Sequence, residues 1–199
     1  MIKKYNSIYS NLQLGSKVTI LLSLVFLGGI VLTGLILNTI LLANAEKQIA
    51  SEATGILQTI TSVREYNSAQ IMPELSERFE TEYLPQTIPT YAVKEVFKNL
   101  RQNRGYENYF YKDAALNPTN PVDQADDFET ELVKRFRQKN DIQQLVGYRN
   151  IDNNQKYFIA RPFAVTKLSC LRCHSTPEAA PKTMVDNYGV TGGFGWKLN

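Results

Sequence analysis

The strongest feature of the hydropathy pattern is an apolar run near the N-terminus. From Val18 to Ala45, 28 residues carry no charged side chain. A helix of that length spans about 42 Å, more than the roughly 30 Å hydrocarbon core of a bilayer requires. The pattern predicts a transmembrane signal anchor at residues 18–42 rather than a core helix. A cleaved signal peptide is the alternative, because Ala43-Asn44-Ala45 resembles a cleavage site, but signal-peptide apolar regions span only about 7–15 residues.

After this run, apolar positions recur with a helical period. One stripe has spacings of four and three and consists of Ile49, Ala53, Ile56, Ile60 and Val63. It predicts a helix that packs against its own domain, with a coiled contact in a homodimer as the alternative. Pro73 interrupts the pattern, and another helical turn or two is expected over residues 74–79. Thr90 is the predicted N-cap of a helix that carries Val93, Val96, Phe97 and Leu100.

The second half of the chain has shorter elements. Asn117 to Pro121 reads as a long turn, and Asp126 or Asp127 as the cap of a helix that extends through Phe136. Three segments have strand character: residues 106–111, 145–151 and 156–165. The last two are joined by Asp152-Asn153-Asn154, a hairpin-type turn. This order predicts an α+β fold with a small antiparallel sheet flanked by helices.

Charge is distributed unevenly along the chain. Lys3, Lys4 and Lys17 are the only charged residues before Glu46, and the rest of the chain has 19 basic and 19 acidic residues. Basic flanks stay on the cytoplasmic side of a membrane. We therefore expect residues 1–17 in the cytoplasm and a neutral domain, residues 46–199, in the periplasm or thylakoid lumen. A neutral domain does not suggest binding to nucleic acid.

The candidate chemistry is concentrated in one pentapeptide. The chain has two cysteines and one histidine, and they fall together as Cys170-Leu171-Arg172-Cys173-His174. This C-x-x-C-H pattern is the attachment motif of c-type haem, in which the thiols bond to the porphyrin and the histidine ligates iron. Attachment occurs outside the cytoplasm and requires cytochrome c maturation machinery, so motif and charge asymmetry agree.

Three alternatives to haem explain the motif less well. A structural zinc needs four protein ligands, and the chain offers three cysteine or histidine groups. A thioredoxin-type redox pair is expected in a βαβ context, which the pattern lacks. A simple disulfide leaves the histidine unexplained. With that histidine in the motif, no Ser/His/Asp arrangement can be built, so enzymatic activity is not expected.

The sixth iron ligand is left open by the sequence. A second histidine and a free cysteine are both lacking, which leaves methionine as the usual alternative. Met72 is the better candidate, with a space-filling core methionine as the alternative interpretation of that residue. Met184 lies only ten residues after His174, and Tyr66 is a weaker option. An open or water-bound position is an equal alternative, and it would permit binding of a small gas.

Much of residues 50–196 resembles a family of PAS-like, c-haem-binding sensor domains found alone or in front of histidine kinases and nucleotide cyclases. The matching segments are residues 63–66, 72–73, 89–92, 96–97, 115–121, 128–129, 157–162, 170–174, 180–181, 188–189 and 193–196. The resemblance implies one haem c held by Cys170 and Cys173, with His174 as proximal ligand, against a curved antiparallel sheet.

The chain departs from this family in two respects. Some members use a cysteine as distal ligand, and this chain has none to spare. Members also normally continue beyond the position of Asn199, so we expect the sheet to lack its last strand or strands. Arg64 and Arg161 are candidate partners of a haem propionate, with a solvated surface arginine as the alternative. Tyr66, Phe163 and Trp196 are expected in the core.

These features predict a membrane-anchored redox or small-gas sensor. Its partners would be the lipid bilayer and a signalling transmitter or redox partner. The alternatives are a monohaem electron carrier and a haem-free ligand-binding module with an incidental disulfide.

Overall fold

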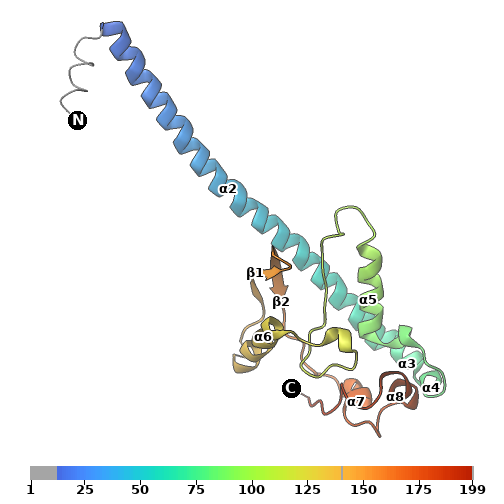
Figure 1. The fold of residues 1–199 in the computed structure, drawn as a ribbon. Helices are drawn as coiled ribbons and strands as arrows, with labels where there is room; N and C mark the ends of the chain where they lie inside the picture. Colours follow the sequence, from blue (N-terminus) through green and yellow to red (C-terminus); the bar gives the residue numbers. More distant parts are fainter. Residues whose placement is uncertain (1–12, 140, 199) are drawn as a thin grey trace. The chain divides into compact units, whose positions relative to one another are not determined.

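The computed structural model describes residues 13–139 and 141–198. The chain divides into two compact units, Met1–Glu52 and Ala53–Asn199. Helix α2, Leu14–Tyr66, begins in the first unit and ends in the second (Figure 1). The predicted transmembrane residues 18–42 lie within this helix. Most of the predicted cytoplasmic segment, residues 1–17, lies outside the described residues.

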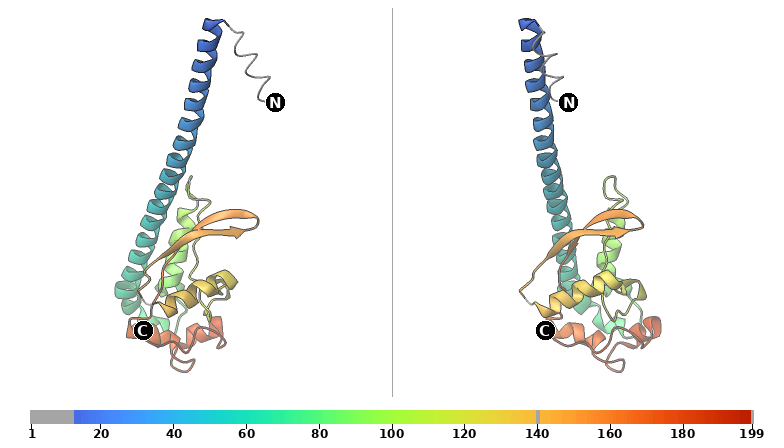
Figure 2. Two further views of the ribbon diagram at one scale, coloured as in Figure 1. Left: turned by 90° about the vertical axis from the view of Figure 1, so that its left-hand side faces the viewer. Right: turned by 60° about the vertical axis from the view of Figure 1, so that its left-hand side comes forward.

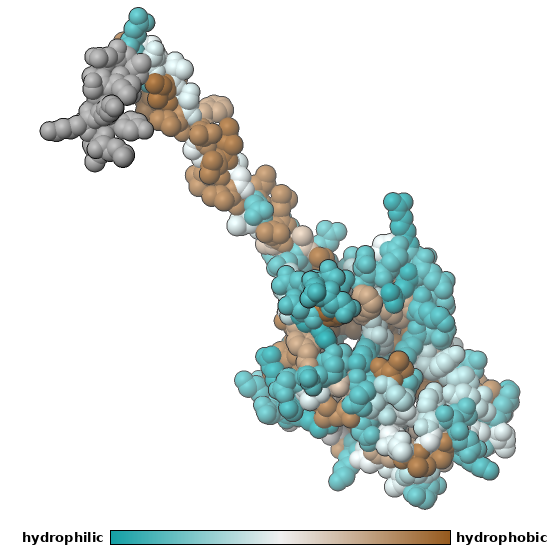
Figure 3. All heavy atoms as spheres, viewed as in Figure 1, coloured by the Kyte–Doolittle hydropathy of each residue, from teal (hydrophilic) through white to brown (hydrophobic). Residues whose placement is uncertain are grey.

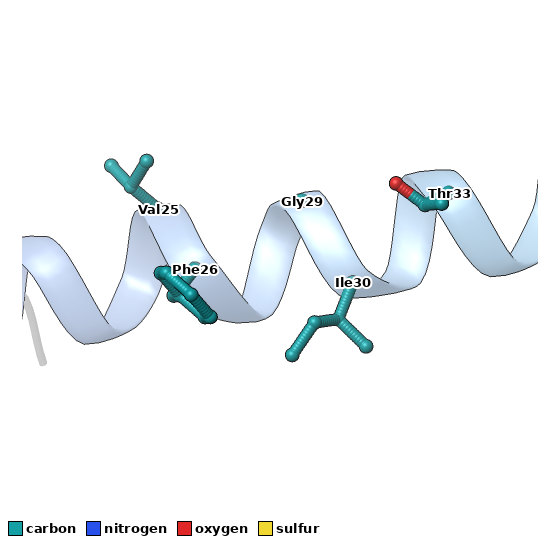
Figure 4. Close-up of a pocket in the computed structure, with 5 residues that line it drawn as sticks. All are labelled: Val25, Phe26, Gly29, Ile30 and Thr33. Carbon is teal, nitrogen blue, oxygen red and sulfur yellow. The ribbon is translucent and has the colours of Figure 1, made fainter.

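In the part that the structure describes, the first unit consists mainly of α2 up to Glu52. Within the described residues, this is the one helix long and apolar enough to cross a membrane, and its most apolar stretch is fully exposed. Apolar residues cover much of the visible face of this part (Figure 3). Gly29 leaves a hollow of about 410 Å³ beside Val25, Phe26, Ile30 and Thr33 (Figure 4). One helix alone lines the hollow, so it cannot enclose a ligand.

Short helical segments follow α2. The π-helical turn η1 (Asn67–Ile71) is followed by the short helices α3 (Met72–Glu74) and α4 (Ser76–Phe79). The 3₁₀ turn η2 (Pro85–Thr87) and the longer helix α5 (Pro89–Leu100) come next. Pro89 is the first residue of α5, a position that suits proline because its missing N–H would be unpaired there anyway. The cap position is therefore Ile88, and the prediction of Thr90 as N-cap was wrong.

The core of the second unit lies between α5 and the end of α2. Ile60, Val93 and Phe97 are buried together, and Ile56, Val63, Leu100, Tyr109 and Tyr111 pack against them. Ile56, Ile60 and Val63 belong to the predicted apolar stripe. These three positions pack inside their own domain, as expected from the periodicity, whereas Ile49 at the start of the stripe is 44% exposed.

The small sheet is a two-stranded antiparallel hairpin of β1, Leu145–Ile151, and β2, Asn154–Ala160. The bounds of β1 agree with the prediction, whereas β2 ends at Ala160 rather than Val165. Asp152 and Asn153 have positive φ angles of 50° and 62°, as a tight two-residue hairpin turn requires.

Helix α6, Asp127–Gln138, packs against the hairpin. Asp126 is its N-cap and forms a capping box with Glu129, which satisfies backbone N–H groups at the helix start. The Phe128 ring of α6 meets the Phe158 ring of β2 edge-on, with centroids 5.1 Å apart. The predicted cap and the α+β fold class are confirmed.

The predicted strand at residues 106–111 does not form. Its aromatic side chains pack individually instead: Tyr111 meets Phe97 with ring centroids 5.6 Å apart, and Phe110 is 68% exposed. Aromatic residues favour strands only where a partner strand pairs with them.

Two helices lie near the C-terminal end, and the first of them carries the haem motif. They are α7, Leu168–His174, and α8, Lys182–Tyr188, drawn in orange-red and red in Figures 1 and 2. Helix α8 contacts the end of α4 and the segment after it. The hydroxyl groups of Tyr188 and Tyr83 lie 2.9 Å apart, and Thr183 donates to the carbonyl of Phe79. Met184 of α8 is buried.

Candidate haem site

Helix α7 brings the three residues of the motif together. Cys170 and Cys173 are three positions apart, so their side chains share one face of the helix. Both thiols are free and half-buried. His174 follows as the last residue of α7. Two free thiols on one helix face, beside an imidazole, form the donor set that covalent haem attachment requires.

A backbone carbonyl orients the imidazole of His174. Its Nδ1 lies 2.8 Å from the carbonyl oxygen of Gly193, which accepts a hydrogen bond when Nδ1 carries the proton. That tautomer leaves the lone pair of Nε2 available to a metal. Burial lowers the pKa of His174, and the Gly193 contact opposes this only in part. The neutral, ligating form is therefore favoured.

Trp196 holds the same imidazole from one face. The two rings are stacked with centroids 3.9 Å apart and planes 10° apart. The backbone N–H of Trp196 also donates to the backbone carbonyl of His174 (3.0 Å), and the backbone N–H of Gly195 donates to that of Ser175 (2.8 Å). Trp196 was expected in the core, and the structure gives it a place in the site. Its contacts fix both the ring and the end of α7.

The turn at residues 117–121 docks on this C-terminal segment. The Asn117 side chain accepts from the Gly193 N–H and donates to the Phe194 carbonyl. Thr119 Oγ1 lies 3.5 Å from Nδ1 of His174. A Cβ atom on Gly192 would lie 2.4 Å from the carbonyl oxygen of Pro118, so the backbones meet more closely than a side chain allows. We call residues 117–119 and 192–196 the histidine clamp.

Two partly exposed ion pairs link α7 to the rest of the second unit. Arg172, inside the motif, pairs with the carboxylate of Glu80 and donates to the carbonyl of Ser76. Lys167, at the N-cap of α7, lies 2.5 Å from Glu65 of α2. Burial raises the pKa of Cys173 to about 11, although Arg172 acts in the opposite direction. The thiol therefore stays protonated at neutral pH.

The other sequence candidates are dispersed. Tyr66 ends α2 and is 54% exposed, Met72 begins α3 half-buried, and Arg161 is exposed with its Nε bound to Gln144. None of them has a described contact with His174. Phe163 is 61% exposed, so its expected place in the core was wrong, as was that of Tyr66.

Arg64 lies in a dense polar network. Its guanidinium bonds to Asp113, Tyr111 and Thr90 at 2.7–2.9 Å, and Phe163 lies against it at 4.9 Å. Burial acts against the charge, but Asp113 and Tyr111 outweigh it and raise the pKa of Arg64. Within the described residues, the network therefore joins α2 to α5 and to the segment after it.

We expect Arg64→Met to lower the free energy of unfolding by roughly 3–5 kcal/mol, because it leaves the mostly buried carboxylate of Asp113 without a cationic partner and bonded only to the Tyr111 hydroxyl. Arg78→Met breaks an exposed pair with Glu82 and should cost only about 0–1 kcal/mol. Urea denaturation of both variants measures the difference. Equal losses would show that the network contributes no more than a surface ion pair.

Two thiols on one helix face beside an oriented imidazole are the donor arrangement expected of a c-type haem domain. The model of the family Tll0287-like: Tll0287 matches residues 42–199, and the chain belongs to this family. The resemblance stated from the sequence is thereby confirmed. No curated protein matches the chain.

One solved structure is similar, the crystal structure of the cyanobacterial heme-protein Tll0287. It shares 16% identity with a TM-score of 0.54, and the match covers 76% of this chain and 88% of that one. At this identity, the likeness shows the fold alone.

Proposed function

We propose that this chain is a membrane-anchored c-type haem protein whose domain lies outside the cytoplasm and senses redox state or a small gas. The observation that carries the proposal is the donor set on α7: two free thiols on one face, followed by an imidazole whose Nδ1 is held by Gly193. Cys170 and Cys173 would hold the porphyrin through thioether bonds, and His174 would ligate the iron through Nε2. The haem would supply a redox-active iron that also binds small ligands.

The sensor role is supported by the connection between the motif and α2. Lys167, at the N-cap position of α7, forms an exposed ion pair with Glu65, one residue before the end of the helix that carries the apolar segment. A change in the position of His174 would move α7 and thereby alter the ion pair between Lys167 and Glu65. An electron carrier has no need of such a connection, because its iron should change oxidation state with little movement of the protein.

The membrane role rests on the apolar segment of α2 and on the lysines before it. Lys17 lies three residues into the helix, and Lys3 and Lys4 lie outside the described residues. Basic residues at this end favour a cytoplasmic N-terminus. The domain would then be on the side where cytochrome c maturation takes place.

The test uses the full chain produced with cytochrome c maturation machinery. Optical spectra of the reduced protein are recorded before and after carbon monoxide and nitric oxide. A gas sensor should show a shifted Soret band, and a redox sensor should show a redox-dependent change in the protection of residues 53–66 against hydrogen exchange. If neither change occurs and electrons exchange rapidly with a soluble cytochrome, the electron carrier replaces the sensor.

Glu65→Gln provides a matched variant for the coupling. It removes the charge that pairs with Lys167 but leaves Cys170, Cys173 and His174 unchanged. We expect haem attachment to persist and the exchange difference in residues 53–66 to shrink. Glu82→Gln, in an exposed pair on another segment, is the control and should leave the difference unchanged.

A further inference from the structure

A second concave surface lies between α5, residues 110–112 and the turn at residues 120–123. Its volume is about 370 Å³, within the range of small-molecule sites. Four cationic side chains line it, against one carboxylate, that of Asp123. We call this surface the basic pocket and define its cations as Lys94, Lys98, Arg101 and Lys112.

Three of these cations, unlike Arg101, already form ion pairs with carboxylates of the chain. Lys94 lies 2.5 Å from Asp123, Lys112 lies 2.7 Å from Glu129, and Lys98 lies 3.6 Å from Glu95 in an exposed pair. Within the described part of the chain, no carboxylate forms an ion pair with Arg101. Its charge is the one in the basic pocket that a ligand could neutralise.

The hydrogen bonds of Arg101 are also incomplete. One terminal nitrogen donates to the carbonyl of Glu107 (3.0 Å), whereas Nε is buried and has no partner. A buried N–H without an acceptor is unfavourable, and a carboxylate is the acceptor that best matches a guanidinium. Protein atoms cover this Nε, so the other terminal nitrogen, for which the described residues supply no acceptor, is the donor that a carboxylate in the pocket would meet.

Apolar groups beside Arg101 indicate that the ligand is more than a simple ion. The Phe110 ring lies 4.8 Å from the Arg101 guanidinium and is 68% exposed, and Val122, which also lines the pocket, is exposed as well. Phe97 and Tyr111, packed against each other, also line the pocket. An aromatic or aliphatic group could cover these surfaces while its charge meets Arg101.

We propose that the basic pocket binds a small organic carboxylate, with the carboxylate on Arg101 and the apolar portion against Phe110 and Val122. This site uses none of the haem-motif residues, so it stands or falls independently of the proposed haem function. Bound ligand would join α5 to the segment that leads into the turn at residues 117–121, and hence to the histidine clamp.

The test is isothermal titration calorimetry on the full chain in lipid nanodiscs. The probes are benzoate, its neutral isostere benzamide, and inorganic phosphate. We expect saturable binding of benzoate, with benzamide about tenfold weaker or more because it lacks the charge-assisted hydrogen bonds. Phosphate should bind more weakly than benzoate because it has no apolar portion.

Variants localise the binding. Arg101→Gln should weaken benzoate binding by about tenfold or more, whereas Arg104→Gln, at an exposed arginine outside the pocket, should not change it. Phe110→Ala alters an exposed side chain and should weaken benzoate but not phosphate, which keeps the test valid if the Arg101 variant fails to fold. The proposal is overturned if benzoate does not saturate, if benzamide or phosphate binds equally well, or if Arg104→Gln has the same effect as Arg101→Gln.

Discussion

Replacing Cys170 and Cys173 together by serine is expected to abolish covalent haem attachment. The two thiols are the only cysteines in the chain, they are free, and they share one face of α7. Without them no thioether bond can form, and single variants should retain at most one bond. Denaturing mass spectrometry of protein matured in vivo measures the covalent adduct, and a pyridine haemochrome spectrum measures the number of bonds.

The control for this experiment is Ser169→Ala, next to the motif and exposed. It should carry the same haem adduct as the unaltered chain. Serine has the shape of cysteine with a smaller oxygen in place of sulfur, so circular dichroism should show that the double variant keeps its helices. If the unaltered chain matures without an adduct, the proposed function itself is wrong, whatever the variants do.

Gly193→Ala is expected to destabilise the domain and displace His174. Gly193 has φ +83°, and a Cβ atom would lie 2.8 Å from Cβ and 2.9 Å from Cα of Thr119. The backbone conformation costs about 1–2 kcal/mol for a residue other than glycine, and overpacking adds about 1–3 kcal/mol. We expect the free energy of unfolding to fall by about 2–5 kcal/mol and the midpoint potential of the attached iron to shift.

Gly195→Ala is the matched control for the backbone term. Gly195 has a similar φ of +79°, but a Cβ atom there meets nothing within 4 Å. Its loss should be limited to about 1–2 kcal/mol. Thr119→Gly combined with Gly193→Ala should recover part of the stability. Equal losses for the two alanine variants would show that the contact with Thr119 contributes nothing.

Local patterns predicted the local elements well. The apolar stripe through Ile60, the cap at Asp126 and the strand Leu145–Ile151 depend on neighbours within a few residues, and the structure has each of them. The strand expected at residues 106–111 depends on a distant partner. No strand lies beside it in the described part of the chain, so aromatic content alone gave the wrong answer.

The candidate site shows the same division. Cys170, Cys173 and His174 are contiguous, and helical spacing alone brings them together. The residues that orient His174 lie 19 and 55 positions away, at Gly193 and Thr119. The glycine cluster around Gly193 and the turn around Thr119 can be recognised in the sequence. Their contact with the imidazole cannot, because no helical or strand periodicity relates residues so far apart. The one available signal was the presence of two separate segments rich in turn-forming residues and glycine, which could have been predicted to dock on each other.

The separation of the thiols from the residues that steady the imidazole has a practical consequence. A polypeptide cut between Gly189 and Gly192 would still hold both sulfur atoms on α7, yet the Gly193 carbonyl and the Trp196 ring would no longer be tethered to them. Such material could be coloured and carry its pigment covalently while the metal has the wrong spin state. An absorption band and the mass of the adduct would therefore not show that the iron site is intact. A spin-sensitive measurement such as electron paramagnetic resonance should be made on every preparation.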